Sequence, residues 1–247
     1  MTCTGRFLGS EQSRESGGVV PLPDGTWYRF VSTDIADTSA AVLLVNRDRR
    51  TTQTVATYYW PKVPTLDIRL QQGAIVGIQP FGNRASVVVS SPTSNLVLVE
   101  PLQTPGAIRY RLVTPNGRVV VERRLDLPLQ PLTDSIYDAA IASWQERGGP
   151  EHRSLPRAVL TKAIHRPQYL STVRGRVAAS DGTIWLQAGP ESSGVTTWVL
   201  LSSQGRLAGQ VTGPPRLRLL AATNRAILGA ITNEDGVVAL VHYRLGS

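Results

Sequence analysis

Cysteine and lysine are scarce in this chain of 247 residues. Cys3 is the only cysteine, so we expect neither an internal disulfide nor a cysteine zinc cluster. Apart from Lys62 and Lys162, all of the 26 basic residues are arginine. The net charge of +8 invites a nucleic-acid partner, but the arginines are scattered and the run Arg47–Arg50 contains an acid. Unclustered basic charge affects solubility more than it builds a site, so no nucleic-acid partner is expected.

Long apolar runs are also missing. No stretch reaches the 18 apolar residues that indicate a membrane-spanning helix, so no membrane span is expected. The first ten residues lack the apolar segment of a secretory signal, so no signal peptide is predicted in this chain and the compartment is left open. A hydrophobic content of 41% with 18% charged residues is typical of a globular protein.

A short pattern recurs along the chain. The segments Gly5–Gly9, Gly117–Val121 and Gly205–Gly209 each begin with Gly-Arg and continue with small or apolar residues. Two of them directly follow another apolar strand, Arg109–Val113 and Trp198–Leu201. A recurring unit of strand, tight turn and strand predicts repeated antiparallel sheets, as in the blades of a β-propeller.

Alternating apolar residues and turn signals divide the chain into four units. The expected strands are 19–22, 26–32, 40–47 and 50–60; then 74–79, 85–90, 96–100, 107–113 and 118–125; then 174–179, 183–187, 196–202 and 206–211; and last 217–222, 225–232 and 237–245. The fourth unit is one strand short. We expect Gly5–Gly9 to pair with 237–245 and complete it; the alternative is that Gly5–Gly9 ends a blade lost upstream.

A helical insert, residues 133–166, interrupts the sheets. Thr133 or Asp134 can cap a first helix, and Ser154 can cap a second one that ends before Pro167. We expect this amphipathic pair to be a lid that packs on one face of the sheet stack. A functional gate is the alternative.

The third and fourth units carry motifs that resemble a known family. These are Ser180–Leu186, Trp198–Leu200, Gly205–Gly209, Ile227–Gly229 and Tyr243–Leu245. They resemble the C-terminal end of bacterial six-bladed β-propeller proteins, many of them exported, and the likeness covers about residues 132–245.

The resemblance implies an all-β fold, a β-propeller or partial propeller of four-stranded antiparallel blades, as a single domain over 1–247. It also implies an extracytoplasmic location. About four blades are present here, so the chain is either a shortened member or a smaller ring of four. An incomplete ring would leave free sheets through which copies could associate.

Three turn residues are the candidate metal ligands. Asp24 and Asp181 each precede a glycine in the first hairpin of a unit, and Asn224 lies at the corresponding turn of the last. Their oxygens could bind calcium or another hard cation. Asp and Asn are also ordinary turn residues that accept bonds from their own backbone. We favour the turn role and predict no metal and no cofactor. Trp27 and Trp185, which follow two of these turns, are expected in the core between blades.

Catalytic motifs are weak. His152, His165 and His242 have no metal-ligand spacing, and no nucleophile elbow, phosphate loop or dinucleotide fingerprint occurs. The sequence therefore predicts a non-catalytic scaffold or binding module for an unknown protein or small molecule. The alternative is a propeller-type hydrolase, lactonase-like or glycosidase-like, acting at the central channel. Such an enzyme needs acids or histidines that converge on the axis from distant positions.

Overall fold

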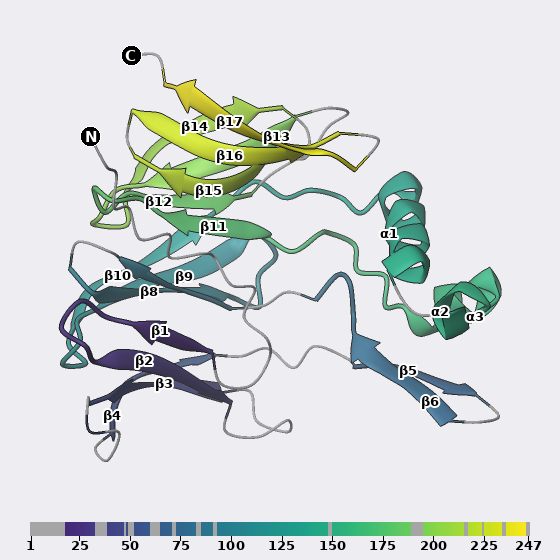
Figure 1. Ribbon diagram of the computed structural model, residues 1–247, viewed down its shortest axis with the longest axis horizontal. Helices are drawn as coiled ribbons and strands as arrows, with labels where there is room; N and C mark the ends of the chain where they lie inside the picture. The colour runs from purple at the N-terminus through teal and green to yellow at the C-terminus, as the bar shows by residue number, and fades with distance from the viewer. Residues whose placement is uncertain are drawn as a thin grey trace.

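The computed structural model describes most of the chain and shows mainly antiparallel sheets (Figure 1). The described residues are 18–32, 39–46, 48, 52–59, 65–70, 73–82, 85–90, 93–147, 150–188, 195–214, 217–223, 225–233 and 236–245. Of the residues named above, Cys3, Gly5–Gly9, Lys62, Asn224 and most of the run Arg47–Arg50 lie outside this part.

Four meanders make up the body of the molecule. The first sheet is β1 (Val19–Pro21), β2 (Trp27–Ser32), β3 (Ser39–Val45) and β4 (Thr52–Tyr59); the second is β7 (Ser86–Ser90), β8 (Asn95–Pro101), β9 (Ala107–Val113) and β10 (Val119–Asp126). The third is β11 (Gly175–Ala178), β12 (Ile184–Gln187), β13 (Thr196–Leu201) and β14 (Leu207–Gly213); the fourth is β15 (Arg218–Ala222), β16 (Ala226–Thr232) and β17 (Val238–Arg244). In each sheet the strands are paired in chain order, as the sequence predicts.

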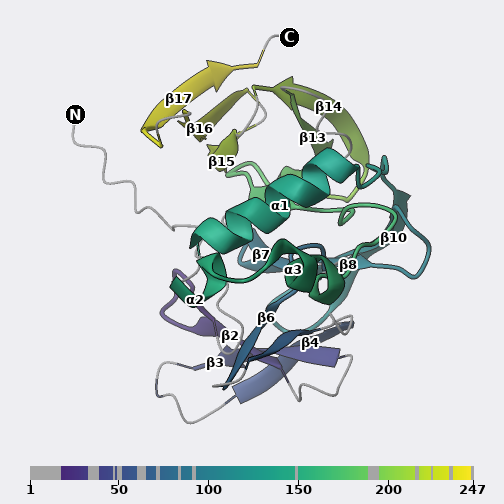
Figure 2. The same ribbon diagram turned by 90° about the vertical axis from the view of Figure 1, so that its right-hand side faces the viewer.

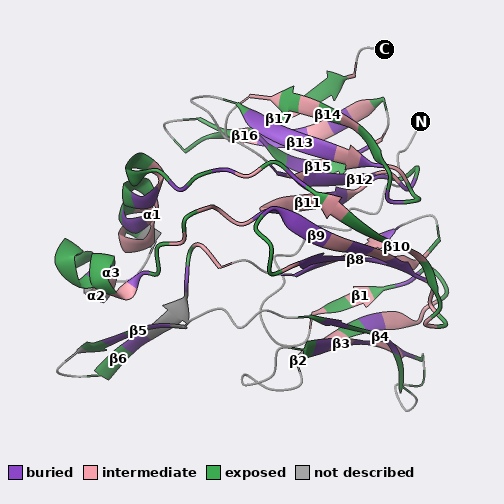
Figure 3. Ribbon diagram, turned by 180° about the vertical axis from the view of Figure 1, so that it is seen from behind, coloured by how far each residue is buried: buried purple, intermediate pink, exposed green. Residues whose placement is uncertain are grey.

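The sheets are stacked face to face, and β8 shows why. Strand side chains alternate between the two faces of a sheet, and both faces of β8 are apolar and buried. Leu96 and Leu98 belong to the core with the first sheet, whereas Val97 and Val99 belong to the core with the third. A further core joins the third and fourth sheets. The resulting stack has the second and third sheets in its middle (Figure 3).

The first strands of the second, third and fourth sheets lie along one edge of the stack. β11 contacts both β7 and β15, and we call this the inner edge. The last strands β10, β14 and β17 lie far from it and are mostly exposed (Figure 2). None of the buried cores formed by the described residues joins the first sheet to the fourth. These two sheets are therefore the ends of the stack.

The expectation that 74–79 belongs to the second sheet is wrong. β6 (Gly73–Ile78) pairs instead with β5 (Thr65–Leu70) in a separate two-stranded hairpin. The strand β5 was missed because the nearby prolines suggested a loop. Its alternation was visible, since Leu66 and Ile68 are buried on either side of Asp67, as in a strand with one buried face.

Three helices follow β10, namely α1 (Asp134–Arg147), α2 (Pro150–Arg153) and α3 (Arg157–Ala163). Thr133 caps α1, because its hydroxyl accepts a bond from the Ile136 N–H at 3.3 Å. Ser154 does not cap the next long helix; Pro156 stands at the start of α3 and offers no side-chain bond. No described helix has the length and apolar content to cross a bilayer.

The helices pack on the hairpin β5–β6 rather than on a face of the sheet stack, so the expected lid is not observed. Their shared core combines Leu66 and Ile68 of β5 with Tyr137, Ile141 and Leu160 of the helices. The Tyr137 hydroxyl also donates to a carbonyl at the end of α3. Hairpin and helices form a satellite module beside the stack (Figure 1, right).

Candidate functional site

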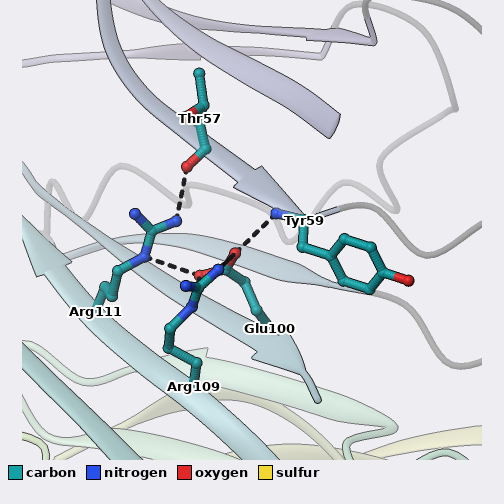
Figure 4. Close-up of polar contacts among 5 residues, drawn as sticks. All are labelled: Thr57, Tyr59, Glu100, Arg109 and Arg111. Carbon is teal, nitrogen blue, oxygen red and sulfur yellow. Dashed lines mark hydrogen bonds and ion pairs between the residues drawn. The ribbon is translucent and has the colours of Figure 1, made fainter. Parts of the chain in front are cut away.

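A buried ionic cluster lies between the first two sheets (Figure 4). Glu100 on β8 is fully buried, and two arginines of β9 surround it. Arg109 donates from Nε at 3.1 Å and from a terminal nitrogen at 2.8 Å, and Arg111 donates from Nε at 2.8 Å. Hydrogen bonding to the carboxylate raises the pKa of Arg109. A buried carboxylate needs such partners because it has lost its water.

The cluster also binds the free edge of the first sheet. The Tyr59 N–H donates to Glu100 at 2.7 Å, and Arg111 donates to the Thr57 carbonyl at 2.7 Å. Both backbone groups belong to β4, the last strand of its sheet, where no further strand can satisfy them. The cluster therefore holds two sheets together. All four bonding positions on Glu100 are used structurally, which makes this residue a clamp rather than a free base.

A second cation lies at the inner edge of the stack. Arg176 on β11 donates from Nε to the Val87 carbonyl at 3.3 Å, and Val87 is on β7, an edge strand of the second sheet. Desolvation lowers the pKa of Arg176. No acid among the described residues forms an ion pair with it.

The terminal nitrogens of Arg176 are available. They donate to no acceptor in the described part of the chain, and neither is sealed from solvent as an unpaired buried atom. A guanidinium carries five N–H donors and keeps its charge. Among the described residues, Arg176 therefore has four N–H donors without an acceptor and no acid to balance its charge.

Tyr58 on β4 lies within electrostatic reach of both sites. Burial raises the pKa of Tyr58 to about 12, with an opposing effect from Arg176 and a smaller reinforcing one from Glu100. The phenol is thus neutral around pH 7 and provides no countercharge.

The two described turn acids have the turn role. The Thr26 N–H donates to Asp24 at 2.9 Å, and the Thr183 N–H donates to Asp181 at 2.9 Å. Each carboxylate therefore stabilises its own hairpin, as favoured from the sequence, while Asn224 lies outside the described residues. Among the residues that the structure describes, no three His, Cys, Asp or Glu side chains gather as a metal site.

The three histidines are on separate elements. His152 of α2 stacks on the Trp144 ring of α1, with 4.3 Å between ring centroids. His165 follows α3, and its backbone N–H donates to Gln79 at 2.9 Å. His242 is exposed on β17. The structure does not bring the three side chains together.

The tryptophan predictions have mixed outcomes. Trp185 is 0% exposed in the core between the third and fourth sheets, which confirms its expected burial, and Trp198 is 3% exposed in the same core. Trp27 is not in a core of the described residues. It alternates with the buried Tyr28 on β2 and is only partly covered.

The ionic cluster and Arg176 were missed from the sequence. A signal was present for the cluster, because Glu100 is a lone acid directly after the apolar run Leu96–Val99, and an acid buried with apolar neighbours requires a cationic partner. Nothing distinguished Arg176 among the many other arginines. Neither a family model nor a curated protein matches this chain.

Proposed function

We propose that this chain is a non-catalytic binding module, built as a β-propeller or partial propeller of the six-bladed bacterial type. The support is the stack of meanders, in which the first strands of the second, third and fourth sheets lie along a common inner edge. Sheets arranged in this way provide a rigid frame on which edges and loops present ligand-binding groups.

Arg176 is the residue that supports the proposal of a bound ligand. Removing a cation from water without pairing it is costly; the side chain of Arg176 is partly desolvated, and no acid among the described residues forms an ion pair with it. An anionic oxygen group of a ligand would supply the missing charge. The free donors of a guanidinium match the two oxygens of a carboxylate or phosphate. The module therefore binds an anionic ligand at the inner edge.

Side-chain NMR tests this assignment. The Nε–H signal of Arg176 is identified by its loss in Arg176→Lys and followed during titration with succinate and with inorganic phosphate. Saturable shifts are expected, and Arg176→Gln should weaken the affinity at least about tenfold, the effect of losing about 1.4 kcal/mol of binding free energy. Arg218→Gln, which changes an exposed arginine of another first strand, should leave the affinity unchanged. If the two variants bind with equal affinity, Arg176 does not contact the ligand.

A substrate screen tests the alternative of a hydrolase. Generic lactones, esters and aryl glycosides are incubated with the protein, and no turnover is expected. Hydrolysis that is lost in Asp24→Asn or Asp181→Asn would replace the binding proposal by the enzymatic one. The two variants retain a side-chain oxygen that can accept the turn bond, so a loss of activity would report on chemistry rather than on folding.

A further inference from the structure

The fourth sheet has an exposed edge strand. Its described strands are three, whereas each of the other three meanders has four. The edge strand β17 is apolar and uncovered, with Val238 61% and Leu240 68% exposed. Unpaired N–H and C=O groups on such an edge form a template for another strand. In the second and third sheets the corresponding position beside the third strand is filled by β10 and β14.

The Gly-Arg pattern marks those fourth strands. Gly117 precedes β10 and Gly205 precedes β14, at φ values of +85° and +67° that favour glycine. Each turn lies against the preceding sheet. A Cβ at Gly117 would be 3.2 Å from the Val55 carbonyl oxygen of the first sheet, and one at Gly205 would be 2.5 Å from the Tyr110 ring of the second. The pattern thus combines a tight turn with a sheet-to-sheet contact.

A Gly-Arg pair by itself does not identify a fourth strand, as another occurrence shows. Gly175 and Arg176 begin β11, a first strand, and Gly175 is not among the glycines with positive φ. All four meanders, however, already have their first strand in β1, β7, β11 and β15. A strand formed by Gly5–Gly9 could therefore pair with the open edge of β17, but not as a first strand at the inner edge.

We propose that Gly5–Gly9 adds to β17 as an antiparallel fourth strand and completes the fourth sheet. Gly5–Gly9 matches Gly205–Gly209 in both glycines and the arginine. Eight residues, 10–17, connect it to Gly18 before β1, and they can span roughly 30 Å. Only four residues connect the fourth strand β14 to the next first strand β15. The added strand would tie the fourth sheet to the first, the two ends of the stack. This inference depends on the sheets and not on the anion site.

Disulfide trapping tests the pairing in the full chain. On a Cys3→Ser background, Leu8→Cys is combined with a single cysteine at each position from 239 to 243 and oxidised. An intramolecular disulfide is expected at one or two of these positions, read by mass spectrometry of the linked peptides. The matched control places the second cysteine at Leu207, an exposed residue of β14, where no link is expected.

Two other outcomes would overturn the proposal. Disulfides only between chains would assign the β17 edge to a second copy, and no link at any of the five positions would exclude the pairing. Hydrogen exchange provides a readout that needs no cysteine. Phe7→Pro removes a backbone donor and should weaken the pairing. Exchange of alternate β17 amides should become at least about tenfold faster, which corresponds to a free energy of local opening that is lower by about 1.4 kcal/mol. Amides of β10 should be unaffected, and unchanged β17 exchange would contradict the pairing.

Discussion

Gly205, in the turn between β13 and β14, lies directly against the ring of Tyr110 on β9. A Cβ atom at this glycine would be 2.5 Å from Cδ1 of the tyrosine, closer than any ordinary contact. The third sheet thus rests on the second through a position where a side chain has no room. The spacing of these two sheets is set by a residue that provides no side chain.

Gly205→Ala should therefore destabilise the protein more than Gly236→Ala. Both glycines have positive φ, 67° and 81°, but nothing lies within 4 Å of a Cβ at Gly236. The Gly236 variant should lose about 1–2 kcal/mol from backbone strain. Overpacking against Tyr110 should bring the loss at Gly205 to about 2–5 kcal/mol. Urea unfolding of both variants measures the difference, and equal losses would show that the ring moves aside freely.

Removing the charge of Glu100 should unbalance the buried cluster. In Glu100→Gln the two arginine partners lose their countercharge, and one bond to the backbone of β4 is weakened. Breaking a buried pair in this way costs about 3–5 kcal/mol. Asp126→Asn is the control, because its ion pair with Arg124 is 3.5 Å long and mostly exposed; such pairs contribute less than about 1 kcal/mol. A small loss for Glu100→Gln would contradict the clamp.

The stability of the protein should respond differently to loss of the hydroxyl at two buried tyrosines. Tyr28 donates to the Ser94 carbonyl at 2.7 Å, so Tyr28→Phe should lose about 1 kcal/mol. The Tyr110 hydroxyl is buried and has no partner among the described residues. Tyr110→Phe removes an unsatisfied group and should leave stability unchanged or slightly higher. Thermal unfolding compares them, and a clear loss for Tyr110→Phe would reveal a partner for its hydroxyl.

Stability should fall above pH 10. Burial raises the pKa of Tyr28, Tyr58 and Tyr110 from 10.0 to about 12. The unfolded chain then releases these protons at lower pH than the folded one. The contribution of these tyrosines to the unfolding free energy is fully present below pH 10. It is lost as the pH rises toward 12, by up to about 2.7 kcal/mol for each tyrosine.

The alkaline loss can be measured by urea unfolding between pH 9 and 12, with tyrosine ionisation followed at 295 nm. Tyr110→Phe removes one titrating phenol. It should therefore reduce the slope of the unfolding free energy against pH by at most about 1.4 kcal/mol per pH unit. A stability that stays constant over this interval would contradict the raised pKa values.

Trp185 and Trp198 should each be essential to the core between the third and fourth sheets. Replacement by alanine should cost about 3–5 kcal/mol, because a large buried ring leaves a cavity. Phenylalanine should cost less, since it keeps an aromatic ring and removes an indole N–H that has no acceptor in the described part of the chain. An unchanged melting midpoint in both alanine variants would show that the rings are not core.

The sequence by itself determined the local units. Turn residues and strands such as Arg109–Val113 and Trp198–Leu201 predicted four meanders with nearly correct bounds, because hairpin pairing is set by neighbouring residues. The turn role of Asp24 and Asp181 was also predictable for that reason, since each acid bonds within its own hairpin.

Only the tertiary structure decided which distant residues meet. Glu100 receives its bond from Tyr59, 41 positions earlier, and Arg176 reaches Val87, 89 positions earlier. The hairpin β5–β6 packs against helices from which it is separated in the chain by one complete sheet, β7–β10. Such contacts depend on how sheets stack, and many apolar faces of similar size compete for each place in the stack. Alternation along a strand indicates that a face is buried, but the partner is chosen by the packing of the whole chain.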